Sequence, residues 1–249
     1  MINADARLPQ DLFAALPGKD AVMGHDVAVN CDRWQEALSA RGLPPLQGVL
    51  ADAGVTKISR ADVFEVGSRE ITPSNAFQLL YYSLAWGLGG RAPRLHQRLN
   101  ALAAHQDRAE NLLVDAWRAA RNGEPAQKVY GVLTTDRGAG RIPWFGPAFS
   151  TKFLYFAQGS EVPPLYVILD QVVARNLADV WPGAPKNAWF PDTYDRYCAV
   201  AGSWAEQATE RLDGARKVRA DEIEFVLFNR GYGRAVGTPQ LGQAGQRGN

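Results

Sequence analysis

The chain has 249 residues, of which 46% are hydrophobic and 10% aromatic, and its formal net charge at pH 7 is +1. This length and composition predict a globular protein with a sizeable core and exclude an intrinsically disordered chain. The balanced charge argues against a broad basic face, so any contact with nucleic acid must come from local placement of arginine, lysine and helix N-termini.

Several absences in the sequence indicate a cytoplasmic protein without cofactors. No apolar run is long enough to span a membrane, and residues 1–18 lack the basic start and apolar stretch of a secretory signal. Two cysteines, Cys31 and Cys198, are too few for a disulfide framework or an iron–sulfur cluster. The three histidines, His25, His96 and His105, lack the spacing of metal ligands, so we expect neither a metal nor another cofactor.

Residues 1–70 are expected to form an N-terminal segment that packs on a helical body. Apolar spacing and helix-stop residues predict a short helix over residues 8–16 and a second helix over residues 32–41. Residues 62–66 alternate between polar and apolar side chains, which predicts a short strand.

Residues 71–232 have helical period and are expected to form the core of the protein. Thr72 can cap a helix whose first position is Pro73. Further helices are predicted over residues 93–105, 107–121, 127–133, 149–157, 171–180 and 220–229, with a long helix following residue 192. Residues 233–249 are rich in Gly and Gln, which predicts a disordered tail. The predicted fold class is mainly α, with at most a short β element in the N-terminal part.

Lys152 is the one charged residue between Gly146 and Phe156. On a helix, Phe149, Tyr155 and Phe156 share its face, so the ammonium lies on the aromatic side. Loss of solvation there favours the neutral amine, which can act as a nucleophile. The alternative is a lysine whose stem lies along apolar surface while its ammonium reaches water.

Asp170 follows Lys152 by 18 positions, inside the otherwise apolar stretch of residues 166–174. A carboxylate among buried residues needs a stabilising partner. If Asp170 caps the helix that begins at Gln171, the helix dipole keeps it ionised at neutral pH. Capping alone is the alternative role.

The segment from residue 127 to residue 157 predicts a helix–hairpin–helix motif, in which N–H groups at the start of the second helix can bind a phosphate oxygen. The run Pro147-Ala148-Phe149-Ser150-Thr151-Lys152 resembles the hairpin of the helix–hairpin–helix DNA glycosylases, closest to the 8-oxoguanine DNA glycosylase branch. The resemblance spans about residues 142–178. Ala148 and Ser150 replace the two hairpin glycines of that family.

This resemblance implies that Lys152 is the amine nucleophile and Asp170 the catalytic carboxylate. The implied activity is excision of a damaged or modified base from double-stranded DNA, with 8-oxoguanine or a bulky modified base as the substrate, and with AP-lyase capacity. The protein is expected to act as a monomer at the nucleoid. The alternative is a non-catalytic helix–hairpin–helix DNA-binding protein, in which Lys152 contacts phosphate and Asp170 only caps.

Two groups of residues complete the predicted site. The expected DNA contacts are Arg141, Gly146, Ala148, Phe149, Ser150, Thr151 and Arg175. A base that leaves the stack needs a pocket of aromatic and apolar side chains. The candidates for that pocket are Tyr81, Trp86, Trp144, Phe145 and Phe228.

Overall fold

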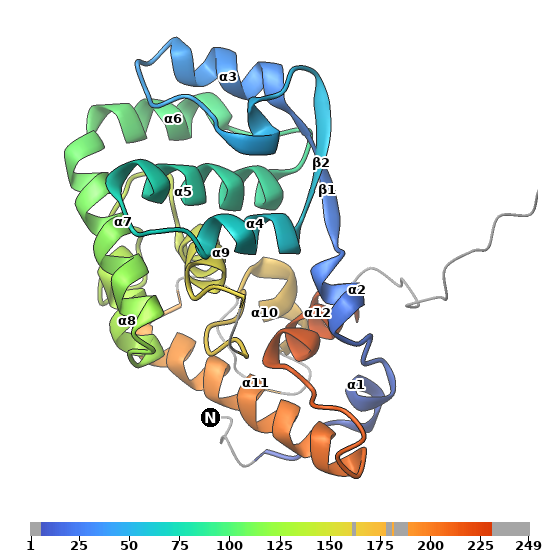
Figure 1. Cartoon of the computed structure of the whole chain (residues 1–249). Helices are drawn as coiled ribbons and strands as arrows, with labels where there is room; N and C mark the ends of the chain where they lie inside the picture. Colours follow the sequence, from blue (N-terminus) through green and yellow to red (C-terminus); the bar gives the residue numbers. More distant parts are fainter. Residues whose placement is uncertain (1–5, 161–162, 178–180, 182–188, 231–249) are drawn as a thin grey trace, which may run out of the picture.

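The computed structural model describes residues 6–160, 163–177, 181 and 189–230. The predicted tail over residues 233–249 therefore lies outside the described residues. Within them the chain forms twelve α-helices, one short 3-10 helix and a two-stranded sheet. Figure 1 shows how the helices and the sheet are arranged. The predicted fold class, mainly α with a short β element in the N-terminal part, is confirmed. Among the described helices, none has the length and apolar character needed to cross a membrane.

The N-terminal part contains short elements around an antiparallel strand pair. In chain order these are α1 (Gln10–Ala14), α2 (Lys19–Met23), β1 (Asp26–Asn30), α3 (Cys31–Ser39), the 3-10 helix η1 (Gly48–Ala51), β2 (Val55–Ser59) and α4 (Arg60–Gly67). Asp26 lies opposite Ser59 and Asn30 lies opposite Val55 in the strand pair. Both helices predicted here are present, as α1 and α3.

The strand predicted over residues 62–66 is wrong, because these residues belong to α4. Ser59 and Asp62 form a capping box that starts this helix. The Ser59 hydroxyl accepts a hydrogen bond from the Asp62 N–H at 3.2 Å, and the Asp62 carboxylate accepts one from the Ser59 N–H at 2.7 Å. The cap outweighs the local alternation, and the β element lies just before it.

The rest of the chain forms the helical body. Its helices are α5 (Pro73–Leu88), α6 (Leu95–Ala104), α7 (Gln106–Arg121), α8 (Ala126–Leu133), α9 (Pro147–Ala157), α10 (Gln171–Leu177), α11 (Pro191–Arg211) and α12 (Ala220–Arg230). Thr72 caps α5 as predicted, because its hydroxyl accepts a hydrogen bond from the Asn75 N–H at 3.2 Å.

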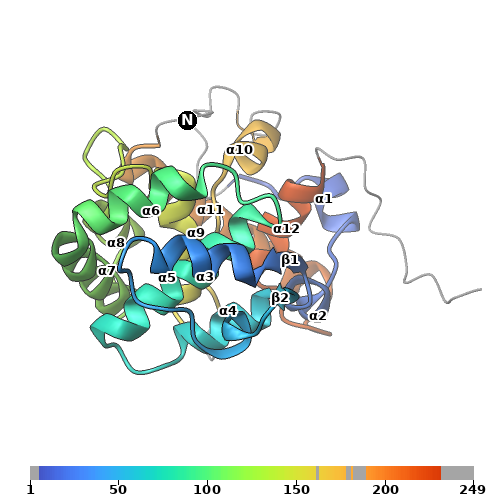
Figure 2. The same cartoon turned by 90° about the horizontal axis from the view of Figure 1, so that it is seen from above.

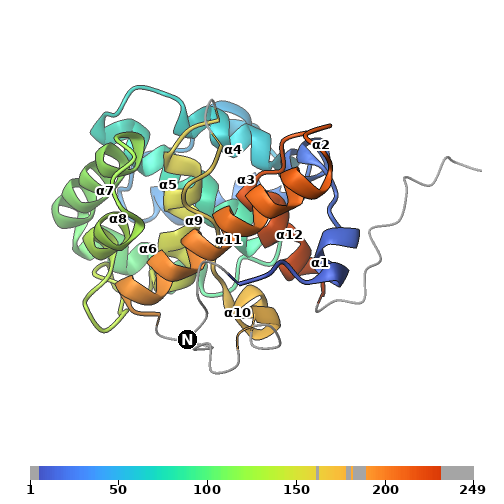
Figure 3. The same cartoon turned by 90° about the horizontal axis from the view of Figure 1, so that it is seen from below.

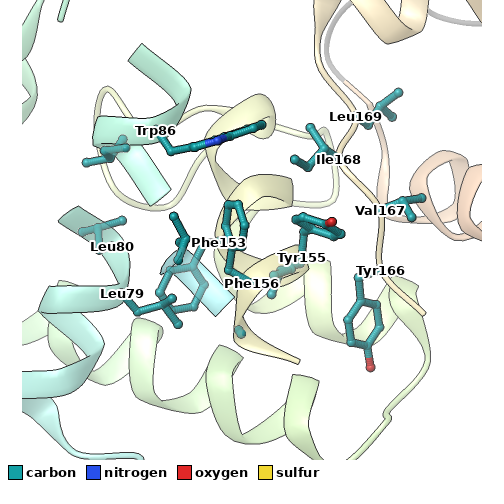
Figure 4. Packing of buried hydrophobic residues seen from close by; sticks show 14 of the residues in the cluster. Leu79, Leu80, Trp86, Phe153, Tyr155, Phe156, Tyr166, Val167, Ile168 and Leu169 are labelled. Atoms are coloured by element: carbon teal, nitrogen blue, oxygen red, sulfur yellow. The ribbon is translucent and has the colours of Figure 1, made fainter. Parts of the chain in front are cut away.

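Helix α9 lies at the centre of the molecule, with α5, α7, α4 and α8 packed around it (Figures 1 and 2). Every residue from Ser150 to Ala157 is buried. Figure 4 shows Phe153, Tyr155 and Phe156 of α9 between side chains of α5 and of residues 166–169. A hydrophobic core therefore surrounds the helix that carries Lys152.

The N-terminal segment and the last two helices pack together, as Figure 3 shows for α1, α2, α11 and α12. The Trp204 indole N–H donates to the Ala6 carbonyl at 2.9 Å, and the Gly18 N–H donates to the Glu222 carboxylate at 3.0 Å. Hydrogen bonds over about 200 positions of sequence thus join the two ends of the described chain.

Candidate active site

Lys152 and Asp170 form an ion pair in the interior, with 3.1 Å between Lys152 Nζ and Asp170 Oδ2. Their side chains are only 8% and 16% exposed. Lys152 comes from α9, and Asp170 directly precedes α10. The structure therefore brings together the two residues predicted to be catalytic.

Thr151 fixes the register that places Asp170 beside Lys152. Its hydroxyl donates to the Leu169 carbonyl at 3.0 Å and accepts from the Leu169 N–H at 3.1 Å. Gln158, at the end of α9, holds Tyr166 through hydrogen bonds to both its N–H and its carbonyl. The segment before Asp170 is thus attached to α9, one residue away from the ion pair. Thr151 was predicted to contact DNA, but its side chain is fully buried and acts inside the protein.

The two oxygens of Asp170 have different partners. Oδ1 accepts hydrogen bonds from the N–H groups of Val172 at 3.0 Å and Val173 at 3.1 Å, which caps α10. Oδ2 faces Lys152. Burial alone would raise the pKa of the Asp170 carboxyl, but the Lys152 charge and the hydrogen bonds from Val173, Lys152 and Val172 outweigh it. The pKa therefore lies below its ordinary value of 3.8, and Asp170 is ionised at neutral pH.

The stem of Lys152 lies against the bare backbone of α5 at Gly87. A Cβ at that position would be 2.8 Å from Lys152 Cδ and 3.1 Å from Lys152 Cε. Gly87 lies inside α5, which continues to Leu88. Gly87 is thus a site residue that the sequence analysis missed. A glycine inside a helical pattern was the available signal, since such a glycine weakens the helix unless close packing requires it.

The segment that resembles a glycosylase hairpin is helical from Pro147 onward. The N–H groups of Phe149 and Ser150 both donate to the Gly146 carbonyl, at 2.9 and 3.2 Å. Ala148 and Ser150, which replace the hairpin glycines, therefore lie in right-handed helix, where a glycine is not required. Ser150 is buried, whereas Gly146, Ala148 and Phe149 are half-buried near the start of α9.

The two arginines predicted to contact DNA differ in their surroundings. Arg175 is exposed on α10, and its Nε donates to the Gln171 carbonyl at 3.2 Å. Arg141 is half-buried, and its Nε donates to the carbonyls of Gly131 at 3.2 Å and Thr134 at 2.9 Å. Arg141 therefore secures the loop that leads into α9.

The five candidates for a base pocket lie in three places. Trp86 and Phe228 both contact the His25 ring, with ring centroids 5.3 and 6.0 Å away, and Trp86 immediately precedes Gly87. Trp144 and Phe145 line a cleft at the start of α9. Tyr81 is fully buried and lies beside Phe77.

Two further aromatic residues adjoin Trp86 and Phe228 around His25. Phe225 of α12 lies 5.4 Å from His25 between ring centroids, and Phe156 of α9 lies 5.6 Å from Trp86. We call His25, Trp86, Phe156, Phe225 and Phe228 the aromatic group. His25 was given no role by the sequence, because it lies between two short elements far from α9 in the chain.

A buried ion pair supports the aromatic group. Arg60 Nη1 lies 2.6 Å from Glu224 Oε2, and both side chains are 1% exposed. The guanidinium carbon of Arg60 lies 5.0 Å from the Trp86 ring centroid and 5.5 Å from that of Phe225. Burial raises the pKa of Glu224 although Arg60 opposes this shift, and the nearby charge of Asp170 also raises it. This ion pair connects α4 with α12 next to the aromatic group.

Among the described residues, no group of three or more His, Cys, Asp or Glu side chains is placed to hold a metal ion.

The model of a protein family described as "Putative 8-oxoguanine DNA glycosylase OGG-like protein" matches residues 20–228, a range that includes Lys152, Asp170 and the aromatic group. Searches among curated proteins and among solved structures gave no match. The chain therefore belongs to the OGG-like 8-oxoguanine DNA glycosylase family, which indicates a DNA glycosylase-like role with DNA as the substrate.

Proposed function

We propose that the protein is a DNA glycosylase with AP-lyase capacity, in which Lys152 is the nucleophile and Asp170 the catalytic carboxylate. It acts as a monomer at the nucleoid, on double-stranded DNA that contains a damaged or modified base. The observation that carries the proposal is the 3.1 Å ion pair of these two residues, largely withdrawn from solvent, in a chain of this family.

The chemistry follows from the two charges. When the N-glycosidic bond breaks, its electron pair leaves with the base, which takes up a proton, and positive charge develops on the sugar. An ionised Asp170 stabilises that charge. Asp170 can also relay a proton from the Lys152 ammonium to the departing base, which leaves a neutral amine and an ionised Asp170. The amine then adds to C1′, a proton passes from its nitrogen to O4′, and the C1′–O4′ bond breaks to give a Schiff base.

The lyase step continues from this Schiff base. Loss of a proton from C2′ and cleavage of the C3′–O bond release the 3′ phosphate by β-elimination. In the aromatic group, His25, Phe225 and Phe228 are half-buried, so their rings keep exposed surface that can stack with a flipped base. We propose that the aromatic group receives 8-oxoguanine or a bulky modified base.

Borohydride trapping tests the nucleophile directly, because borohydride reduces the Schiff base to a stable protein–DNA adduct. We expect the wild-type protein to form this adduct on duplexes that carry the substrate base, and Lys152→Gln to form none. Thermal unfolding of the variant serves as the control for folding. An unchanged adduct yield in Lys152→Gln would move the nucleophile to another residue.

Asp170→Asn separates catalysis from capping, since Asn also caps helices well. We expect base release to fall by about 10²-fold or more, while affinity for DNA is kept or increased because a negative charge is removed. The cap hydrogen bonds of Asp170 favour a second candidate function, a non-catalytic DNA-binding protein. That candidate predicts no adduct with the wild-type protein and near-normal DNA binding by both variants.

A further inference from the structure

A cleft at the start of α9 contains two arginines that the proposed chemistry does not use. It has a volume of about 500 Å³, and its lining includes Arg94, Arg98, Trp144, Gly146, Phe149 and Gln171. Gln171 directly follows Asp170, and Phe149 lies one helical turn before Lys152. The cleft therefore borders the candidate active site.

The two arginines are held by aromatic rings of the same cleft. The guanidinium carbon of Arg98 lies 4.6 Å from the Phe149 ring centroid, and that of Arg94 lies 5.7 Å from the Trp144 ring centroid. Phe149 also faces Gly87, against which the Lys152 stem lies. One aromatic ring thus connects Arg98 with the surroundings of the nucleophile.

Among the described residues, no acidic side chain balances the positive charge in this cleft. None of its described lining residues is Asp or Glu, and within the described part of the chain neither Arg94 nor Arg98 forms an ion pair. Burial, followed by repulsion from Arg94, lowers the pKa of Arg98. An anion between the two guanidinium groups would relieve both effects.

The backbone at both rims of the cleft adopts an uncommon conformation. Arg94 has φ +57° and Trp144 has φ +69°, which makes them two of the four described non-glycine residues with positive φ. This region is unfavourable for residues with a Cβ, and it persists where the surrounding structure imposes it, often at binding sites. In this protein the two residues with positive φ, Arg94 and Trp144, are also the two whose side chains contact each other across the cleft.

We propose that this cleft binds backbone phosphate of the DNA strand next to the extruded nucleotide, with Arg94 and Arg98 as the phosphate ligands. The inference rests on the proposed function, because it places the strand relative to Lys152. Guanidinium groups bind phosphate oxygens through paired hydrogen bonds. The N-terminus of α9, which opens into the same cleft at Gly146, adds a favourable dipole.

The test measures the salt dependence of binding to a duplex that contains a tetrahydrofuran abasic analogue. Each phosphate contact contributes about −0.9 to the slope of log affinity against log salt. We expect the double variant Arg94→Gln/Arg98→Gln to have a slope less steep by about 0.9 to 1.8, which corresponds to one or two phosphates. Arg118→Gln, on exposed α7 surface outside the cleft, is the matched control and should keep the wild-type slope. A wild-type slope in the double variant would overturn the proposal.

A second measurement leaves the protein unchanged. Neutral methylphosphonate linkages, introduced one at a time around the abasic site, should weaken wild-type binding at one or two adjacent positions. The double variant should not respond at those positions. If no linkage next to the abasic site weakens wild-type binding, the cleft does not hold a backbone phosphate.

Borohydride trapping distinguishes failure of this inference from failure of the proposed function. The wild-type protein should form the adduct on duplexes that carry the substrate base whether or not the cleft holds a phosphate, because Lys152 and Asp170 carry the proposed chemistry. If the wild-type protein forms the adduct but the double variant keeps the wild-type salt slope, the cleft proposal is refuted and the proposed function is not. No trapping by the wild-type protein, together with the expected loss of slope, would refute the glycosylase and leave the cleft as a DNA contact.

Discussion

At the residue scale, the position of the Lys152 amine depends on Gly87, which has no side chain. Gly87 lets the lysine stem lie directly on α5, while Asp170 holds the ammonium from the opposite end. Such an arrangement leaves the stem little freedom. Catalysis is sensitive to displacements of this kind, because a misplacement of about 1 Å can reduce a rate by about 10²-fold.

Gly87→Ala should therefore damage activity without damaging the fold. The new methyl group would lie 2.8 Å from Lys152 Cδ and force the stem to move. We expect the rate of borohydride trapping to fall by about 10- to 100-fold. Stability should change little, because alanine favours a helix interior by about 1 kcal/mol over glycine. Gly202→Ala on α11 is the control, since a Cβ there meets nothing within 4 Å. Equal trapping rates in the two variants would show that the stem adapts freely.

Asp170 should also make stability depend on acid pH. Its pKa is lowered in the folded protein, so its stabilising contribution is complete above the unfolded value of 3.8 and is lost as pH falls from there through the folded value. The difference in unfolding free energy between the wild type and Asp170→Asn should therefore be constant from neutral pH down to about 5 and shrink below 3.8. Denaturant titrations across this range measure it. A difference that is already shrinking between pH 7 and 5 would contradict a lowered pKa.

At the scale of elements, apolar period and caps were sufficient to predict most helices, whereas only the resemblance to the glycosylase hairpin implied that Lys152 and Asp170 belong to one site. Two features depended on information outside the local pattern. Residues 62–66 alternate like a strand, yet the Ser59 cap starts a helix there. The aromatic group joins five residues from four separate parts of the chain, and no local period records such a contact.

Helix α4 approaches α9 closely enough to require a glycine. A Cβ on Gly67 would overlap the Phe156 carbonyl, which is backbone and cannot rotate away. We expect Gly67→Ala to lower the free energy of unfolding by about 1–3 kcal/mol or more, since the two helices must separate. Gly131→Ala on α8, where a Cβ meets nothing within 4 Å, should be neutral or slightly stabilising. If chemical denaturation gives the two variants equal stability, the packing of α4 on α9 is looser than described.

At the scale of the whole molecule, a net charge of +1 limits how the protein holds DNA. We expect affinity to rest on a few local contacts, with Arg94 and Arg98 in the cleft at the start of α9 and the exposed Arg175 on α10 as the cationic side chains. We expect the wild-type slope of log affinity against log salt on duplex DNA to be roughly −3 to −5. A slope of about −8 or steeper would reveal an extended basic surface assembled from distant arginines, and a slope near zero would contradict duplex DNA as the partner.

The buried pair of Arg60 and Glu224 has a consequence for the order in which the protein is made. The two residues are 164 positions apart, so Arg60 leaves the ribosome long before its partner exists. Until α12 is synthesised, the Arg60 guanidinium has to remain solvated. Arg60 can therefore take its buried place between α4 and α12 only after residue 224 has been made, however early α4 itself forms.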